Sequence, residues 1–470
     1  IRKGYEAEEE RLRNLAADFG TARYEQIQST FAHNYDAPVR IRNVRIFQPE
    51  TLDMSAPVSV LIKGDRIAAI EPLDASGSDD EVVIDGAGGS LIPGLYDMHA
   101  HMGDNAALLN VLAGITSVRD MGNELKVLEP LREKIENGIL AGPRISMSGF
   151  IEGVSETNAS TGELAATEAE AVELVRMYAD RGGYHQIKIY SSVKGEWVPA
   201  MAAQAHARGM RVAGHIPAFS TANDMIEAGY DEITHINQVM LGWVLTPEED
   251  TRTLFRITGM RRFADLDLNS DKVQKTINMM VEKGIVVDPT TVIHEFGLLG
   301  RNGETRAGVA DYIGNMPVSE QRNSKVALLD VADEAEDTAY RAAFAKIIDM
   351  LAMMNERGIF IVPGTDLGGA FELHREVELF GKFGFTPAEA VRRASYDMAN
   401  YLGFADSRGS IEAGKLADFF LVPGDPTTDA KAIKTISMVS RGGIIYFPSE
   451  IYPEFGITPF TEIPVVSGAE

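Results

Sequence analysis

The sequence predicts an α/β fold: a (β/α)8 TIM barrel, a small discontinuous β-sandwich domain built from both ends of the chain, and an N-terminal helical arm. Three observations support this prediction. From Leu91 to about residue 404, short apolar runs alternate with amphipathic helical patterns, as in a parallel barrel. Short β-type runs separated by turn residues occur on both sides of that region. From about Gly4 to Ala32 the chain is rich in Glu, Arg, Leu and Ala at helical spacing.

Composition limits the classes of protein to which the chain can belong. A chain of 470 residues is too long for one ordinary core, so one large domain and a smaller one are expected. The net charge of −25 opposes binding to nucleic acid or anionic lipid, and no apolar run is long enough for membrane insertion. There is no cysteine, so histidine, carboxylate or a modified side chain must hold any metal.

In chain order the sequence divides into four predicted parts. These are the helical arm (residues 1–37), the composite β-sandwich (38–90 with 405–450), the barrel (91–404) and a C-terminal tail (451–470). We interpret the arm as a packing or oligomer-contact element and expect a homo-oligomer. The chain begins at Ile1 rather than Met and has no cysteine, so export to the periplasm or outside the cell, with a removed signal, is favoured over a cytoplasmic location.

Eight candidate strands with interleaved helices make up the predicted barrel. They are Leu91 to Met102, Ile115 to Met121, Arg144 to Gly149, Gln186 to Ser191, Arg211 to Ile216, Glu232 to Asn237, Ile285 to Val292 and Ile359 to Pro363. The connections 239–271 and 296–337 are unusually long and are expected to be lids or substrate loops. A capping box with proline at the first helical position, Thr386-Pro-Ala-Glu389, predicts a helix start.

The first barrel strand ends in two histidines, His99 and His101. Side chains at positions i and i+2 of a strand point to the same face, so both imidazoles are aimed at one spot. This is a geometry for binding a metal. The alternative is that both are strand histidines satisfied by local hydrogen bonds.

Other chemistry-bearing residues stand near the ends of later strands. Lys188 lies between two isoleucines on strand four, and if that face is the barrel interior its ammonium must form an ion pair, lose its proton or be modified. Strands five and six carry His215 and His235, each of which alone would be typical of a structural histidine. Asp366 follows strand eight at the barrel mouth, where it could also cap the next helix.

Together these motifs resemble the metal-dependent amidohydrolase superfamily, in particular its imidazolonepropionase-like and Xaa-Pro dipeptidase-like members. The motifs are Pro93-Gly-Leu-Tyr-Asp-Met-His99-Ala-His101, Gly114-Ile-Thr-Ser-Val-Arg-Asp120-Met-Gly, Ile-Lys188-Ile, His215, His235, Gly364-Thr-Asp366 and Gly409-Ser-Ile-Glu-Ala-Gly-Lys-Leu-Ala-Asp418. The resemblance extends from about Val39 to Tyr446. It implies two divalent metal ions bridged by a lysine that CO2 has carboxylated.

The resemblance also implies a ligand set: His99, His101 and Asp366 for one metal, His215 and His235 for the other, and carboxylated Lys188 for both. Imidazole and carboxylate ligands favour Zn2+ as the metal. A hydroxide bridging the two metals would attack the substrate carbonyl, with Asp366 as general base and then general acid. The site would keep about one positive charge, which favours a small, carboxylate-bearing substrate.

Four residues are candidates for substrate contact: Tyr190, Asn237, His294 and Arg119. Tyr190 shares the strand face of Lys188, and Asn237 stands two residues beyond His235. For each of the four, core packing or a supporting hydrogen bond is the alternative role. Where the dipeptidase-like branch often has Glu-His-Gly after its histidine, this chain has Ile236-Asn-Gln238.

Three hypotheses for function follow from the sequence. The leading hypothesis is a binuclear metal-dependent amidohydrolase that cleaves an amide bond of an N-acyl amino acid or a dipeptide, including Xaa-Pro-like and aryl-amide substrates. The second hypothesis keeps the site but has a lactone, cyclic amide or ester as the substrate. The third is a non-catalytic barrel that only binds its ligand.

Overall fold

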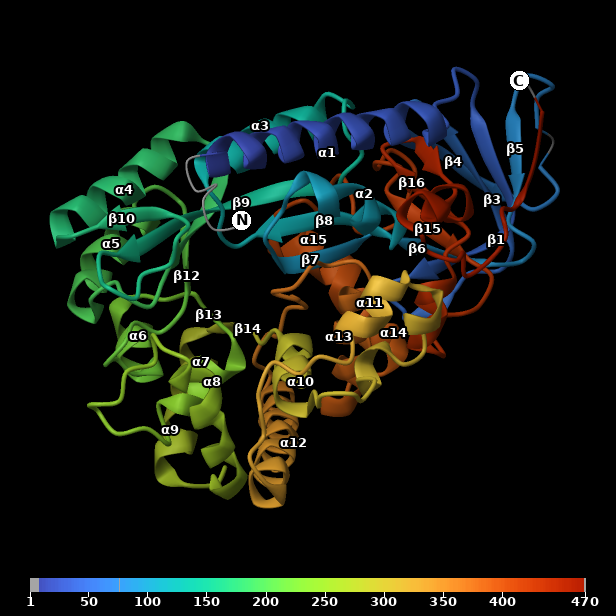
Figure 1. Ribbon diagram of the computed structural model, residues 1–470. Coiled ribbons are helices and arrows are strands. Elements are labelled where there is room, and N and C mark those ends of the chain that lie inside the picture. The colour runs from blue at the N-terminus through green and yellow to red at the C-terminus, as the bar shows by residue number, and fades with distance from the viewer. Residues whose placement is uncertain (1–7, 76, 469–470) are drawn as a thin grey trace.

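The computed structural model describes residues 8–75 and 77–468, which form two β-sheets with helices packed around them (Figure 1). One sheet is a parallel series in which each strand is bonded to the next along the chain. Its strands are β7 (Leu95–Ala100), β8 (Ile115–Asp120), β9 (Arg144–Gly153), β11 (Tyr184–Ile189), β12 (Arg211–Gly214), β13 (Glu232–Thr234) and β14 (Val286–Asp288), with β10 (Glu163–Ala165) paired to β9. Nearly every residue of these strands is buried, as expected when helices cover the outside of a parallel sheet.

The gap between β14 and β7 is filled by an irregular segment rather than by an eighth regular strand. The backbone N–H of Val362 donates to the carbonyl of Val287 (2.9 Å), and that of Met98 donates to the carbonyl of Pro363 (2.8 Å). Only Ile361 forms a bridge pair, with Val287. Because proline has no N–H to donate, the predicted strand 359–363 does not extend into a ladder. The barrel is therefore nearly closed.

Two predicted strands end three or four residues earlier than the sequence pattern suggested. The prediction of strands 232–237 and 285–292 was wrong at its C-terminal boundaries, because β13 ends at Thr234 and β14 at Asp288. The backbone angle φ is 64° at His235 and 47° at Thr290, in the left-handed region that breaks an extended chain. The helices α7 (Ile236–Leu241) and α10 (Thr291–Leu299) begin immediately after these two residues.

Helices surround the parallel sheet on its outer side (Figure 1). In chain order they are α2 (Asp104–Leu112), α3 (Leu125–Glu136), α4 (Glu168–Arg181), α5 (Val198–His206), α6 (Ala222–Ala228), α8 (Phe255–Thr258), α9 (Asp271–Lys283), α11 (Val318–Asn323), α12 (Glu334–Glu356), α13 (Phe371–Phe380), α14 (Pro387–Arg392), α15 (Met398–Tyr401) and α16 (Pro448–Ile451). The predicted capping box is confirmed at the start of α14, where Thr386 and Glu389 cap each other's backbone N–H groups. No helix of the described part of the chain is both long and apolar enough to cross a membrane.

The second sheet combines strands from before and after the barrel. Its strands are β1 (Val39–Gln48), β2 (Asp53–Met54), β3 (Val58–Lys63), β4 (Arg66–Pro72), β5 (Val82–Asp85), β6 (Ser90–Pro93), β15 (Phe419–Val422), β16 (Met438–Arg441), β17 (Ile444–Tyr446) and β18 (Val465–Gly468). The central strand β6 lies between β1 and β15, so the two ends of the chain meet there. The arrangement of these strands as a two-layer sandwich stays a prediction.

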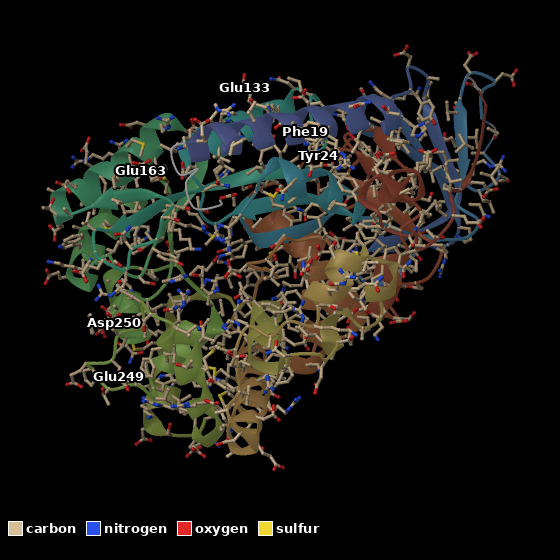
Figure 2. The ribbon with its side chains drawn as sticks, viewed as in Figure 1. Phe19, Tyr24, Glu133, Glu163, Glu249 and Asp250 are labelled. Atoms are coloured by element: carbon tan, nitrogen blue, oxygen red, sulfur yellow. The ribbon has the colours of Figure 1, made fainter. Side chains whose placement is uncertain are left out.

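The N-terminal segment is one continuous helix, α1 (Glu9–Phe31), which extends across the molecule beside the barrel (Figure 1). It contacts α2 and α16. Gln28 on this helix accepts a hydrogen bond from the hydroxyl of Tyr446, and Tyr24 stacks on Phe455 (Figure 2 labels Tyr24). Residues 1–7 of the predicted arm lie outside the described residues. A role for the arm in an oligomer stays a prediction.

Candidate metal centre

Six side chains from β7, β11, the ends of β12 and β13, and the eighth barrel position meet at one end of the barrel. Oδ1 of Asp366 lies 3.0 Å from Nε2 of His101 and 3.5 Å from Nε2 of His99, and Oδ2 lies 3.8 Å from Nε2 of His235. Nζ of Lys188 lies 3.0 Å from Nε2 of His99. The ring of His215 lies 4.8 Å from the ring of His235. The structure therefore brings together every side chain that the sequence assigned to the metals.

Each of the four histidines is held through its outer nitrogen, Nδ1. His99 donates to the carboxylate of Asp288 (2.6 Å), and His101 donates to the carbonyl of Gly122 (2.6 Å). The other two outer nitrogens are hydrogen bonded to hydroxyl groups: His215 to Ser191 (2.8 Å) and His235 to Thr290 (2.8 Å). These contacts leave Nε2 of each ring directed toward the cluster, which is the usual way in which a protein orients metal-binding imidazoles.

The backbone is strained where it carries these side chains. Asp366 has a φ of 53° and His235 a φ of 64°, conformations that residues other than glycine rarely adopt. Strain of this kind concentrates at functional sites, where the surrounding structure holds it in place. Gly364 permits a close approach, because an added Cβ would lie 2.5 Å from Oδ1 of Asp288 and 2.7 Å from Cβ of His99.

Lys188 is buried inside this cluster without an ion-pair partner among the described residues. Its side chain is 1% exposed, and its other neighbours are the rings of Phe150 and Tyr190, whose centroids lie 5.8 and 5.6 Å from Nζ. Burial lowers the pKa of this lysine to about 8, against the opposing effect of the charge on Asp366. An inward carboxylate paired with the ammonium, which was the alternative interpretation, is therefore not what the structure contains.

Burial also sets the charge state of the other groups. Burial, together with the positive charges nearby, lowers the pKa values of His99, His215 and His235 well below the ordinary range, so these rings are neutral near pH 7. Burial would raise the pKa of Asp366, but the neighbouring imidazoles of His235 and His101 and the ammonium of Lys188 outweigh it and lower that pKa. Neutral imidazoles and an ionised carboxylate are the forms that bind metal.

This donor set fits a divalent metal. One ligand atom from each of His99, His101 and Asp366 lies within 4.8 Å of the other two. Nε2 of His215 is buried and has no hydrogen-bond partner among the described residues, a costly arrangement for a structural histidine but the expected one for a metal ligand. His99 and His101 themselves have local partners at both ring nitrogens, so the orphaned atom of His215 is the observation that favours a metal.

A cavity of about 530 Å³ opens over the cluster. Three of the four predicted substrate-contact residues, Tyr190, Asn237 and His294, line this cavity. Tyr190 reaches it from the end of β11, whereas Asn237 belongs to α7 and not to the strand face expected for it. His294 donates Nδ1–H to the carbonyl of Thr290, and burial lowers its pKa to about 4, so the ring is neutral.

The prediction that Arg119 contacts the substrate was wrong. Its side chain is 1% exposed and does not line the cavity. The guanidinium makes two hydrogen bonds to Glu232 (2.7 and 2.6 Å) and lies 3.3 Å from the carboxylate of Asp288. Inside the barrel such a cation must be paired with carboxylates, and these two leave no donor for a substrate. Arg119 therefore supports the residues beneath the metal ligands.

Sequence reasoning missed several residues of the site. Asp288, Ser191 and Thr290 hold the outer nitrogens of three histidines. Ser191 ends a predicted strand, whereas Asp288 and Thr290 lie inside the predicted strand 285–292, so only Ser191 stood at a predicted strand end. Arg256, which lines the cavity from α8, was also missed. It lies within the long connection 239–271, where no periodicity indicates which side chains point inward. Both long connections supply cavity residues, Arg256 from the first and Leu328 from the second.

A nearly closed parallel barrel with histidines and an aspartate at its rim defines a hydrolase of the kind that uses bound metal. Comparison with known proteins agrees with this class. Residues 90–446 match the amidohydrolase family, and the chain belongs to that family.

Individual relatives are distant. An uncharacterized protein of Mycobacterium tuberculosis is 25% identical over 385 residues, which cover 77% of this chain and 86% of the relative. A Xaa-Pro dipeptidase crystallised with bound methionine in its active site has a TM-score of 0.64 at 22% identity and covers 87% of this chain and 100% of its own. The ochratoxinase of A. niger has a TM-score of 0.61 at 16% identity and covers 88% of this chain and 96% of its own. These likenesses support the shared fold.

Proposed function

We propose that this protein is a binuclear metal-dependent amidohydrolase that cleaves the amide bond of a small, carboxylate-bearing substrate, an N-acyl amino acid or a dipeptide. The observation that carries the proposal is the convergence of four Nε2 atoms, one carboxylate and one unpaired lysine at the base of a cavity. His99, His101 and Asp366 would hold one ion, and His215 and His235 the other. Zn2+ suits this set of nitrogen and oxygen donors.

Lys188 would complete the site after reaction with CO2. The ammonium first loses one proton, and the neutral amine then attacks CO2: a nitrogen–carbon bond forms, one C=O π bond of CO2 opens, and a second proton leaves the nitrogen. The two losses convert a buried cation into a carbamate anion. A pKa of about 8 supports this step, because a fraction of the amine is already unprotonated near neutral pH. The product removes the cost of an unpaired ammonium and supplies oxygen atoms within reach of both histidine groups.

When bound, the metals supply an acidified water and polarise the substrate carbonyl. The residues of the chain perform the remaining steps. Asp366 is ionised and faces three of the imidazoles, so it accepts the proton of the attacking water and then delivers it to the leaving nitrogen. Tyr190, which stacks on His215 with ring centroids 3.9 Å apart, presents its hydroxyl to the developing oxyanion.

The names of structural neighbours agree with amide substrates. A Xaa-Pro dipeptidase and an ochratoxinase share the fold, and both names refer to hydrolases of small molecules. The main alternative is that the same groups hydrolyse a lactone, a cyclic amide or an ester. A more distant alternative is a barrel that binds its ligand without catalysis. The proposal does not depend on the oligomeric state or on the location of the protein in the cell.

The decisive test combines metal analysis with a substrate screen. We expect about two ions per chain, loss of activity with a chelator, and recovery when Zn2+ is restored. A library of N-acyl amino acids and dipeptides is then compared with lactones and esters under the same conditions. Faster turnover of lactones would overturn the amide assignment. A folded protein that binds no metal and turns over nothing would support the binding barrel instead.

A further inference from the structure

The arginine that lines the active-site cavity, Arg256, has no ion-pair partner in the part of the chain that the structure describes. Arg256, on α8, lines the cavity together with the metal-ligand cluster and is half-buried. Its backbone carbonyl accepts from Asn237 (3.5 Å), which attaches α8 to α7, but no carboxylate lies within salt-bridge distance of its guanidinium. A partly buried guanidinium without a partner is unusual, because its five N–H groups prefer a carboxylate in a forked arrangement.

The other arginines of the same connection are paired. Arg252 bonds to Asp250, Arg262 to Glu249 and Arg261 to Glu336. Figure 2 labels Glu249 and Asp250 at the outer edge of this region, away from the barrel. Within residues 239–271, then, the arginine that faces the cavity is the one left without a carboxylate.

Arg256 and the metal-ligand cluster share one cavity. The side chains that line it include Arg256 together with His215, His235 and His294. The cavity therefore has a fixed positive group near the metal ligands, in a protein whose net charge is −25. A substrate anion placed there would gain a charge-assisted, two-point contact.

The described residues that line the cavity provide no free carboxylate for a positive group on the substrate. Among its described lining residues the single acid is Asp366, which is already engaged with the metal-ligand histidines. The buried carboxylate of Glu152 nearby accepts backbone N–H groups of Gly153, Ala159 and Ser192, so its oxygens are occupied. The free ammonium of a dipeptide would lose its hydration without finding a counter-charge, which costs binding energy.

Neutral side chains make up the remaining walls. The polar ones that the sequence did not single out are Asn105, Asn123, Ser160, Thr161 and Gln238. The apolar ones include Ile257 and Met260, which come from the same connection as Arg256. Ile293 of α10 and Leu328 of the connection 296–337 also line the cavity. An apolar wall beside a guanidinium is suited to an amino acid whose side chain is apolar and whose carboxylate meets the cation.

From these observations we propose that the substrate is a neutral N-acyl amino acid with an apolar side chain, rather than a dipeptide with a free amino terminus, and that Arg256 binds its carboxylate. This inference rests on the proposed amidohydrolase function and selects one of its two substrate classes. Arg256 contacts the substrate and sets specificity, and the bond-breaking step remains with the metal-ligand cluster. The carboxylate would stand on the leaving-group side of the scissile amide.

Matched substrates test the acyl side. Propionyl-L-leucine and glycyl-L-leucine have the same heavy-atom shape, but the second has an ammonium where the first has a methyl group. We expect the zinc-loaded protein to prefer propionyl-L-leucine by at least about tenfold in kcat/KM, since an unpaired charge in a closed site is strongly disfavoured. Equal rates, or a preference for glycyl-L-leucine, would overturn the neutral acyl group while leaving the amidohydrolase function intact.

Matched variants test the carboxylate side. Arg256→Gln should lower kcat/KM for propionyl-L-leucine about 10- to 100-fold, the effect of losing one charge-assisted contact. N-(3-methylbutyl)propanamide, the same amide without the carboxylate, should be cleaved equally well by the variant and the unaltered protein. Arg261→Gln, on the same connection but paired with Glu336, is the control and should change neither rate. If Arg256→Gln slows both amides equally, the residue acts on structure and not on the carboxylate.

A binding measurement separates this inference from the proposed function. Isothermal titration of the zinc-loaded protein with 4-methylpentanoate, which cannot be hydrolysed, should give about tenfold weaker binding in Arg256→Gln than in Arg261→Gln. If no amide is hydrolysed, the amidohydrolase proposal fails, but this difference would still support Arg256 as the carboxylate receptor. Equal binding by the two variants would remove Arg256 from that role.

Discussion

Nδ1 of His99 lies 2.6 Å from Oδ2 of Asp288, and both side chains are completely buried. The carboxylate fixes the ring so that Nε2 faces Lys188 and Asp366. It also lies 3.3 Å from the guanidinium of Arg119, so one aspartate joins a metal ligand to the polar network inside the barrel. Contacts of this kind orient a ligand and raise its basicity without touching the metal.

Asp288→Asn should therefore weaken metal binding while the protein stays folded. The asparagine side chain can still accept from the ring, but it lacks the negative charge that raises the basicity of His99, and changing a group behind a ligating histidine typically reduces metal affinity about 10- to 100-fold. The measurement is competition for Zn2+ against a chelator of known affinity, with circular dichroism as the check on folding. Asp65→Asn, at an exposed turn, serves as the control. Unchanged affinity in Asp288→Asn would mean that His99 does not depend on this contact.

Asp366→Asn should keep the fold and lose most of the activity. The amide retains the size of the carboxylate but accepts no proton, and positioned acid–base groups typically contribute about 10²- to 10⁴-fold to rate. Because Asp366 is also an expected ligand, the loss should be at the upper end or beyond. The comparison is kcat after both proteins have been saturated with Zn2+. Turnover close to that of the unaltered protein would exclude Asp366 from proton transfer.

Lys188→Ala should lose both bound metal and activity. If the missing group is a bridging carboxylate, added acetate or propionate should restore part of the activity by entering the space that the side chain vacates. Metal content is measured by elemental analysis and rescue by initial rates across a series of acid concentrations. A variant that keeps its full metal content would contradict the bridging role of the lysine.

Glu376 makes stability depend on pH at a position away from the metal ligands. Its carboxylate is fully buried and accepts the backbone N–H groups of Thr291 and Val292 at the start of α10, and burial raises its pKa to about 8. The unfolded chain releases this proton near pH 4.3. Between about pH 4.3 and about pH 8 the folded state binds more protons at Glu376 than the unfolded state does. The contribution of Glu376 to stability is therefore complete below about pH 4.3, the unfolded pKa, and is lost as pH rises through about 8, the folded pKa.

The Glu376→Gln variant should remove this dependence. The free energy of unfolding of the unaltered protein, relative to that of the variant, should fall between about pH 5 and pH 8 by roughly 1.4 kcal/mol for each pH unit. Chemical denaturation at several pH values in that window measures the difference. Glu356→Gln, at an exposed position near the end of α12, is the matched control. A difference that stays constant with pH would show that Glu376 is ionised throughout.

The part of the site that sequence could predict is the part carried by regular structure. Alternation along β7 and β11 places His99 and Lys188 on the inside, because a strand fixes side-chain direction with a period of two. The same rule failed beyond His235 and Thr290, where a left-handed backbone turns the chain directly into a helix. No local sequence pattern predicts a left-handed backbone conformation at a residue other than glycine.

Contacts between distant parts of the chain were harder to predict from the sequence. Ser191 holds His215 and Asp288 holds His99, but each pair joins different strands, and only a closed barrel brings them together. Arg256 lies on a helix of four residues inside a long connection, where hydrophobic periodicity carries no information. The eighth strand was placed correctly in the chain but is reduced to one bridge, because Pro363 cannot continue a ladder.

The second sheet has a consequence for how the protein is made. β6 leads directly into the first barrel strand, yet one of its two neighbours, β15, is translated more than three hundred residues later. β5 pairs with β1 on one side, but its neighbour on the other side is β18, at Val465–Gly468. While the ribosome is still synthesising the barrel, both early strands expose open edges that invite pairing with other chains. We therefore expect the period before release from the ribosome to be the interval in which this protein most needs a chaperone.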